Sequence, residues 1–281
     1  MAGHGEQMAG RPVVYLVGAG PGDPELLTLR AARLIAQADW LIHDALIEPA
    51  VLELAVRAKR IAAGKRAGRP SARQQEINRQ MIVAARSGGV VVRLKGGDPL
   101  IFARAREEID ALVAAGIEPV IVPGITAAQA AYAALGEPMT ERGDRRSVVL
   151  ATPQVQQGAV ADTEWARPVI NAQGGALYMA ASVVPRVRAT LLALGLSAAT
   201  PVAWVADASR AGQTAIRSRL GELRAPEGLP SGAPVILLVG LARTGAAPGV
   251  AVRVPPLSAR QQAADDEQQA QRIERRAEHD A

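Results

Sequence analysis

Short apolar runs alternate with amphipathic segments along the first half of the chain. Residues 13–36 follow the order strand, loop, helix, because a β-branched run enters a Gly/Pro-rich turn and then a helical pattern of apolar residues. Further apolar runs are ADWLIHD, RIAAG, GVVVRLKGGDP and EPVIVPG, and helix-like segments at 51–58, 73–87 and 104–115 separate them. This alternation predicts βαβ units on a mostly parallel sheet.

The alternation breaks in the polar stretch EPMTERGDRRS and then resumes. The second set comprises SVVLAT, GALYMAAS, a helix-like segment at 184–194, PVAWVADAS and PVILLVGLA. We therefore expect two α/β domains joined near 138–147, with a cleft between them. The N-terminal α/β domain is predicted to span 13–141 and the C-terminal α/β domain 146–245.

Both ends of the chain lack this pattern. We expect residues 1–12 to be a disordered N-terminus and the polar segment 246–281 to be a frayed helix or a disordered tail without a function of its own. No apolar run approaches the ~20 residues that a bilayer span needs, and residues 1–11 have no signal-peptide core. A cytoplasmic protein with no membrane partner is expected.

Composition narrows the possible chemistry. The chain has 281 residues and is 49% hydrophobic, which allows a substantial core and excludes general disorder. It has no cysteine, so disulfides, Cys-ligated zinc, iron–sulfur clusters and thiol catalysis are excluded. Of its three histidines, His4 and His279 lie in the polar ends, which argues against a His-rich metal site. We expect chemistry without a metal.

The basic charge leaves two classes of partner open. A net charge of +5 suits nucleic acid or a multiply anionic small substrate. Aromatic residues, which stack on bases, make up only 2% of the chain, and no Lys/Arg block is long enough to form a basic arm. The sequence therefore lacks both features that are typical of nucleic-acid binding. We expect a small-molecule substrate and no nucleic acid.

The first glycine loop holds Gly18, Gly20 and Gly22, which allow a tight turn and close approach of a ligand to the backbone. A dinucleotide-binding fold would use such a loop for pyrophosphate, with Asp44 as the acid after the second strand. However, Asp23 stands where the third glycine of that fingerprint belongs, and its carboxylate would repel pyrophosphate. A purely structural turn remains an alternative.

Two further loops follow apolar strands. Gly96, Gly97 and Asp98 lie at a strand's carboxyl end, where open α/β sheets bind ligands. A carboxylate there suits hydroxyls or a positive centre, so a nucleoside with cationic groups, such as S-adenosylmethionine, would suit both loops; a turn capped by Asp98 is the alternative. The third loop ends its strand at Pro123–Gly124 and opens a helix at Thr126, whose small residues permit close approach of a ligand or of another helix.

These motifs, taken in order, resemble one family: the tetrapyrrole methylases, the class III S-adenosylmethionine-dependent methyltransferases. The matching stretches are VYLVGAGPGDPELLTLRAARLIAQAD, HDALI, AGKRAG, QQEIN, VVRLKGGDPLIFARAREE and VPGITAA, with weaker matches at LYMAAS and PVILLVG. They cover residues 13–142 densely and 147–242 loosely. The ordered series is far more specific than any single glycine loop.

The resemblance implies a homodimer of two-domain α/β chains that binds S-adenosylmethionine in the cleft. It also implies C-methylation of uroporphyrinogen III at C2 and C7 to give precorrin-2, for sirohaem, cobalamin or haem d1. The positions that match the family's cofactor site are Pro21, Gly96, Gly97, Asp98, Ile101, Thr126, Ala127 and Met179, with Ala208 where the family commonly has glycine. Asp44 and Lys65 match the proton acceptor and donor, and Arg104, Glu107 and Arg142 match positions that face the tetrapyrrole.

Several positions depart from the family pattern. Ala105–Arg106 replace Gly-Gly, Glu141 replaces a histidine, Pro153–Gln154 replace Gly-His, and Met179–Ala180 replace Met-Gly. All are expected on the substrate side or the second-domain side of the cleft. They leave open a related methylase with a different precorrin or an RNA substrate, and a non-catalytic cofactor-binding homologue. Judged without the family, Asp44 would be a cap or turn residue and Lys65 a solvated cation.

Overall fold

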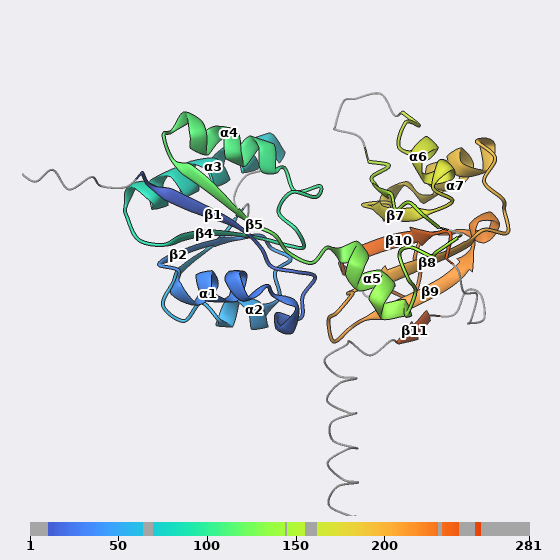
Figure 1. Cartoon of the computed structure of the whole chain (residues 1–281), viewed down its shortest axis with the longest axis horizontal. Coiled ribbons are helices and arrows are strands. Elements are labelled where there is room, and N and C mark those ends of the chain that lie inside the picture. The colour runs from blue at the N-terminus through green and yellow to red at the C-terminus, as the bar shows by residue number, and fades with distance from the viewer. Residues whose placement is uncertain are drawn as a thin grey trace, which may run out of the picture. The chain divides into compact units, whose positions relative to one another are not determined.

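The computed structural model describes residues 11–63, 70–143, 145–154, 162–229, 232–241 and 251–253. They fall into two compact units (Figure 1). One unit comprises the chain up to Gly20 together with Leu26–Ile125, and the other comprises Pro21–Glu25 together with the chain from Thr126 onward. No helix among the described residues combines the length and the apolar character that crossing a membrane requires.

The first unit is built on a five-stranded parallel sheet. The strand order is β3-β2-β4-β1-β5, and every neighbouring pair is parallel. The mostly parallel sheet predicted from the alternation is therefore confirmed. The strands are β1 (Val13–Gly18), β2 (Trp40–His43), β3 (Lys59–Ala62), β4 (Val91–Lys95) and β5 (Glu118–Val122).

Helices cover both faces of this sheet (Figure 1). Helices α1 (Leu29–Gln37) and α2 (Pro49–Glu53) lie on one face, and α3 (Pro70–Arg86) and α4 (Ala105–Ala114) lie on the other. Successive side chains of a strand point to opposite faces, so β1 supplies both cores. Leu16 belongs to the cluster with α3 and α4, and Val17 to the cluster with α1 and α2. Helix α2 is shorter than the predicted segment 51–58, because the chain turns after it to enter β3.

The second unit holds a six-stranded sheet of mainly antiparallel strands. The order is β11-β9-β8-β10-β7-β6, and only the β6–β7 pair is parallel. The strands are β6 (Leu150–Ala151), β7 (Gly175–Tyr178), β8 (Pro201–Ala206), β9 (Thr214–Arg219), β10 (Val235–Val239) and β11 (Ala251–Arg253).

Two of these strands were not expected from the sequence. Strand β9 was not predicted, and β11 lies within the predicted tail 246–281, the rest of which is outside the described residues. Strand β11 pairs antiparallel with β9, which pairs with β8. Backbone hydrogen bonds to a neighbouring strand stabilise β9 and β11. Neither the composition nor the local periodicity of a segment indicates that such a neighbour exists. Of the predicted disordered N-terminus 1–12, only residues 11 and 12 belong to the described part of the chain. The carbonyl of Pro12 accepts a hydrogen bond from the Glu118 N–H at 2.8 Å.

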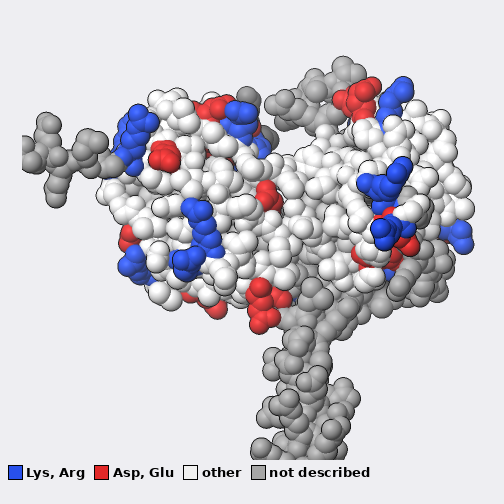
Figure 2. All heavy atoms as spheres, in the orientation of Figure 1, with Lys and Arg blue, Asp and Glu red and all other residues white. Residues whose placement is uncertain are grey.

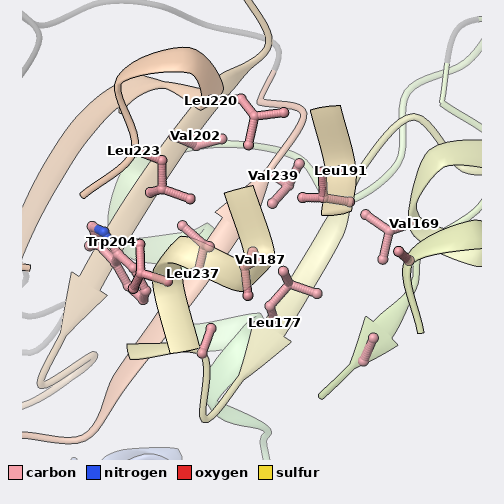
Figure 3. Close-up of a cluster of buried hydrophobic side chains, with 14 of the residues drawn as sticks. Val169, Leu177, Val187, Leu191, Val202, Trp204, Leu220, Leu223, Leu237 and Val239 are labelled. Carbon is pink, nitrogen blue, oxygen red and sulfur yellow. The ribbon is translucent and has the colours of Figure 1, made fainter. Parts of the chain in front are cut away.

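Apolar cores lie on both faces of the second sheet. Helix α5 (Ala127–Leu135) packs on one face, and α6 (Ala166–Asn171) and α7 (Val184–Ala193) pack on the other. Figure 3 shows Val187 and Leu191 of α7 among side chains from β7, β8 and β10, including Leu177, Trp204 and Leu237. The described residues also contain three short 3-10 helices, η1 (Pro24–Leu26), η2 (Ala181–Val183) and η3 (Leu220–Glu222).

The observed division of the chain differs from the predicted joint near 138–147. It falls at Ile125–Thr126, ahead of α5, because the buried side of α5, including Ala131 and Tyr132, packs on the second sheet. The polar stretch is instead a turn inside the second unit. Its Glu141 and Arg145 exchange backbone hydrogen bonds of 2.9 and 3.0 Å. Loss of periodicity there marks a loop rather than a boundary between units.

Candidate active site

Three glycine-containing loops of the first unit meet at the carboxyl edge of its parallel sheet. The N–H of Gly20 donates to the carbonyl of Gly97 at 3.2 Å, and the N–H of Gly97 donates to the carbonyl of Gly20 at 2.8 Å. The N–H of Gly124 donates to Oδ2 of Asp98 at 3.1 Å. The loops after β1, β4 and β5 are therefore joined to one another, at the edge where such sheets bind ligands.

The glycines of these loops have different reasons for lacking a side chain. A Cβ on Gly18 would lie 2.6 Å from the carbonyl oxygen of Gly97, and a Cβ on Gly124 would overlap the same oxygen. Close packing of the loops requires both glycines. A Cβ on Gly96 would meet no atom within 4 Å in the described part of the chain. Gly96 thus borders open space, which suits its predicted place in a ligand site.

Asp98 braces the second loop. Its Oδ1 accepts the N–H of Leu100 at 2.8 Å, while its Oδ2 binds Gly124. The turn-capping role considered from the sequence is therefore present. Each carboxylate oxygen can accept more than one hydrogen bond, so Asp98 can also receive ligand hydroxyls. Ile101, another predicted cofactor residue, closes the same turn through its N–H, 3.4 Å from the Asp98 carbonyl.

Asp44, the predicted proton acceptor, follows β2 and is 37% exposed. Its Oδ1 accepts a hydrogen bond from Nη2 of Arg93 at 2.6 Å. Arg93 lies on the adjacent strand β4 and is almost completely buried. Burial opposes the charge of this guanidinium, but the carboxylates of Asp44 and Glu108 outweigh that penalty and raise the pKa of Arg93. Lys65, the predicted proton donor, lies outside the described residues.

The predicted substrate-binding residues Arg104 and Glu107 form a pair at the start of α4. Nε and Nη2 of Arg104 each lie 2.8 Å from a carboxylate oxygen of Glu107, and both side chains are about half exposed. This contact lowers the pKa of Glu107. The neighbouring Arg106, one of the departures from the family pattern, is exposed and lies 3.6 Å from Asp110. Arg142 lies in an exposed turn of the second unit.

The remaining predicted cofactor residues belong to the second unit, where most lie at one edge of the sheet. Ile236, near the start of β10, pairs with both Tyr178 of β7 and Val205 of β8, so the ends of β7 and β8 share this edge. The Tyr178 hydroxyl accepts the N–H of Ala128 at 3.2 Å, which brings the N-terminus of α5 to the same place.

Local conformation at this edge is unusual. Met179 has a φ of 55° and is half exposed, directly after β7. Ala208 is buried between Asp207 and Ser209, whose φ values are 48° and 70°. Positive φ costs about 1–3 kcal/mol at residues other than glycine, and such positions concentrate at functional sites.

Thr126 and Ala127 begin α5. Oγ1 of Thr126 accepts the N–H of Gln129 at 3.2 Å, and Oε1 of Gln129 accepts the N–H of Thr126 at 3.0 Å. This reciprocal capping box satisfies two backbone donors at the helix start. It also holds the small residue Ala127 at the first position of the helix.

Pro21 is held by residues that the sequence did not single out. Nε of Arg210 donates to the carbonyl of Pro21 at 3.1 Å, and Oγ of Ser209 accepts the N–H of Asp23 at 3.1 Å. A Cβ on Gly22 would collide with the Arg210 side chain. The partners are more than 180 residues apart in the sequence, so no local pattern could have identified them.

Arg93, Lys95 and Glu108 were also missed. Both cations lie in β4, all five residues of which are buried. Buried charges need partners. Two basic residues inside an otherwise apolar strand were therefore the sequence signal for a buried ionic network. The described residues contain no group of three or more His, Asp or Glu side chains that could hold a metal ion.

The two-unit fold and its glycine loops define the class of protein. The chain belongs to the tetrapyrrole (corrin/porphyrin) methylases, since the sequence model of that family matches residues 13–224.

Individual relatives are consistent with this membership. The chain is 44% identical over 230 residues to a uroporphyrinogen-III C-methyltransferase from Pseudomonas aeruginosa, covering 81% of this chain and 92% of that protein. It is 45% identical over 229 residues to a siroheme synthase from Azotobacter vinelandii, covering 81% of this chain and 49% of that protein. The chain thus spans about half the length of the siroheme synthases it matches.

A solved structure shares the fold. It is a uroporphyrin-III C-methyltransferase from Thermus thermophilus in complex with S-adenosylhomocysteine, with a TM-score of 0.68 and 33% identity. The match covers 81% of this chain and 97% of that one.

Proposed function

We propose that this protein transfers methyl groups from S-adenosylmethionine to C2 and C7 of uroporphyrinogen III, giving precorrin-2. The observation that carries the proposal is the set of joined glycine loops, with open space at Gly96 and a braced carboxylate at Asp98. The Pseudomonas aeruginosa methyltransferase, matched over nearly its whole length, supports the substrate.

The residues present fit S-adenosylmethionine. Gly96 and Gly97 allow close approach of a nucleoside, and Asp98 suits ribose hydroxyls or a cationic centre better than it suits phosphate. In the second unit we assign cofactor contacts to Pro21, Thr126, Ala127, Met179 and Ala208. When bound, S-adenosylmethionine supplies an electrophilic methyl group on a sulfonium. The chain's contribution is alignment, which can lower a barrier by about 7–11 kcal/mol when the geometry is good.

Asp44 and Lys65 are assigned to proton transfer. Uroporphyrinogen III is electron-rich, so a pyrrole carbon would attack the methyl group directly. The new carbon–carbon bond would form as the methyl–sulfur bond breaks, and S-adenosylhomocysteine would leave with the electron pair of that bond. The methylated ring is cationic and must lose a proton, which Asp44 accepts. Such a general base typically contributes about 10²–10⁴-fold to the rate. Lys65 holds or returns protons.

Arg104, Glu107 and Arg142 are assigned to the tetrapyrrole. Its eight carboxylates favour charge-assisted hydrogen bonds with guanidinium groups. Glu107 holds the Arg104 side chain in place at the start of α4. A homodimer in the cytoplasm completes the proposal, and sedimentation velocity of the purified chain tests the dimer.

The test is anaerobic incubation of the purified chain with S-adenosylmethionine and enzymatically generated uroporphyrinogen III. We expect product masses that correspond to two added methyl groups. Asp44→Asn should lower the rate by at least about 100-fold. Asp110→Asn, which removes an exposed carboxylate of α4, is the control and should keep the wild-type rate.

Two results would redirect the proposal. Methylation of another precorrin, but not of uroporphyrinogen III, would indicate a related methylase of the same family. Retained binding of S-adenosylmethionine without methylation of any tetrapyrrole would indicate a non-catalytic homologue.

A further inference from the structure

Glu108 is a completely buried carboxylate on the inner side of α4. Its Oε1 accepts hydrogen bonds from Nε of Arg93 at 3.0 Å and from Nε2 of Gln74 at 3.3 Å. Its Oε2 accepts a hydrogen bond from Nζ of Lys95 at 2.9 Å. Three donors from a helix and a strand therefore converge on one carboxylate.

The network reaches the surface through Asp44. The side chains of Arg93, Lys95 and Glu108 are at most 3% exposed, whereas that of Asp44 is 37% exposed. Two carboxylates balance two cations. Burial and the charge of Arg93 lower the pKa of Lys95, although Glu108 opposes the shift. The interior therefore tolerates its second cation poorly, and the loss of Glu108 would leave an unbalanced positive charge.

The guanidinium of Arg93 links the two carboxylates. It is planar and rigid, so fixing one edge fixes the directions of its other N–H groups. Glu108 binds Nε, the carbonyl of Leu94 accepts a hydrogen bond from Nη1 at 3.1 Å, and Asp44 binds Nη2 at 2.6 Å. The orientation of the Asp44 carboxylate is thus set from inside the unit.

Stability alone does not account for this arrangement. Buried ion pairs often contribute no more stability than apolar side chains of the same volume, because desolvation offsets their attraction. Here the ion pairs connect Glu108 on α4, through Arg93, to the partly exposed carboxylate of Asp44 after the end of β2. Lys95, the second cation bound by Glu108, directly precedes the Gly96–Asp98 loop.

We propose that Glu108 is a positioning residue for methyl transfer: through Arg93 it holds the Asp44 carboxylate in the orientation that accepts the ring proton. This inference rests on the proposed function, which assigns proton acceptance to Asp44. A small displacement of a catalytic group can cost about 10²-fold in rate.

Glu108→Gln tests the inference. We expect kcat to fall at least about tenfold, because the Gln side chain offers one acceptor where two cations need acceptors. The Kd for S-adenosylmethionine, measured by calorimetry, should change less than about twofold. Glu137→Gln is the matched control: Glu137 is a buried carboxylate of the second unit, 3.1 Å from Arg217, and this variant should keep the wild-type kcat.

A double-mutant cycle separates positioning from general destabilisation. If Glu108 acts through Asp44, Glu108→Gln should lower kcat little further in an Asp44→Asn background. An equal reduction in both backgrounds would overturn the inference. Glu108→Asp keeps the charge but is shorter, so it supplies the same cycle if Glu108→Gln does not fold.

A crystal structure of the Glu108 variant provides a readout that is independent of activity. We expect the Asp44 carboxylate to lose its contact with Arg93. An unchanged contact between Asp44 and Arg93 would overturn the inference, whatever the activity of the wild-type chain. Inactivity of the wild-type chain toward uroporphyrinogen III would instead refute the proposed function.

Discussion

At the scale of single residues, Asp98 combines a structural and a proposed ligand role. Both of its carboxylate oxygens bind backbone N–H groups, one at Leu100 and one at Gly124. It therefore joins the loops after β4 and β5, and a ligand would find the carboxylate already oriented. The two roles considered from the sequence are thus compatible in one side chain.

Asp98→Ala should weaken S-adenosylmethionine binding at least about tenfold, which corresponds to about 1.4 kcal/mol. It should also lower the free energy of unfolding by about 1–3 kcal/mol, because two backbone donors lose a charged acceptor. Calorimetry and urea denaturation measure the two effects. Asp110→Ala, at an exposed position of α4, is the control. Unchanged cofactor affinity in Asp98→Ala would contradict the assignment of this loop to the cofactor.

At the scale of elements, the glycine loops divide into packing positions and a position that borders open space. Gly18 and Gly124 lie against the Gly97 carbonyl, whereas Gly96 borders open space. All are glycines at or just after the ends of apolar strands, so the sequence does not distinguish them. The distinction arises from which strands are neighbours in the parallel sheet.

Gly96→Ala and Gly124→Ala should therefore behave differently. Gly96→Ala should leave the free energy of unfolding within about 0.5 kcal/mol of wild type and weaken S-adenosylmethionine binding, because its methyl group occupies the ligand's space. Gly124→Ala should lower the free energy of unfolding by about 1–3 kcal/mol or more, because its methyl group collides with backbone. Urea denaturation and calorimetry of both variants measure the contrast. Tight cofactor binding by Gly96→Ala would show that the open space is not the ligand site.

At the scale of the whole molecule, the net charge of +5 matters for a multiply anionic substrate. On the surface shown in Figure 2, acidic and basic side chains are interspersed and do not form one continuous basic patch. Attraction of the proposed substrate should therefore depend on the summed field and on the arginines assigned to it, Arg104 and Arg142.

Salt should accordingly affect the two substrates unequally. Raising the NaCl concentration from about 0.05 M to about 0.5 M should increase the KM for uroporphyrinogen III at least about threefold, because screening shortens the reach of the field. The Kd for S-adenosylmethionine should change less than about twofold, because this ligand carries little net charge. Steady-state kinetics and calorimetry in a salt series test the difference. An equal response of both ligands would contradict a substrate site governed by charge complementarity.

The features that local chemistry encodes could be predicted from the amino-acid sequence alone. Alternating apolar and amphipathic segments specified the parallel sheet of the first unit, since strands buried on both faces and their crossover helices leave a readable pattern. Glycines at the ends of those strands marked the loops that meet at the carboxyl edge of the sheet. The ordered motifs identified the family, whose model matches residues 13–224.

Features that depend on residues distant in the chain became visible only in the folded structure. Strands β9 and β11 exist through pairing, and α5 belongs to the second unit because its apolar face packs there. Arg210 meets Pro21 across 189 positions of sequence. Asp44 meets Arg93 because β2 and β4 are neighbours, and Arg93 meets Glu108 because α4 covers that face of the sheet. Burial makes each of these charges require a partner, and folding alone determines which partner is within reach.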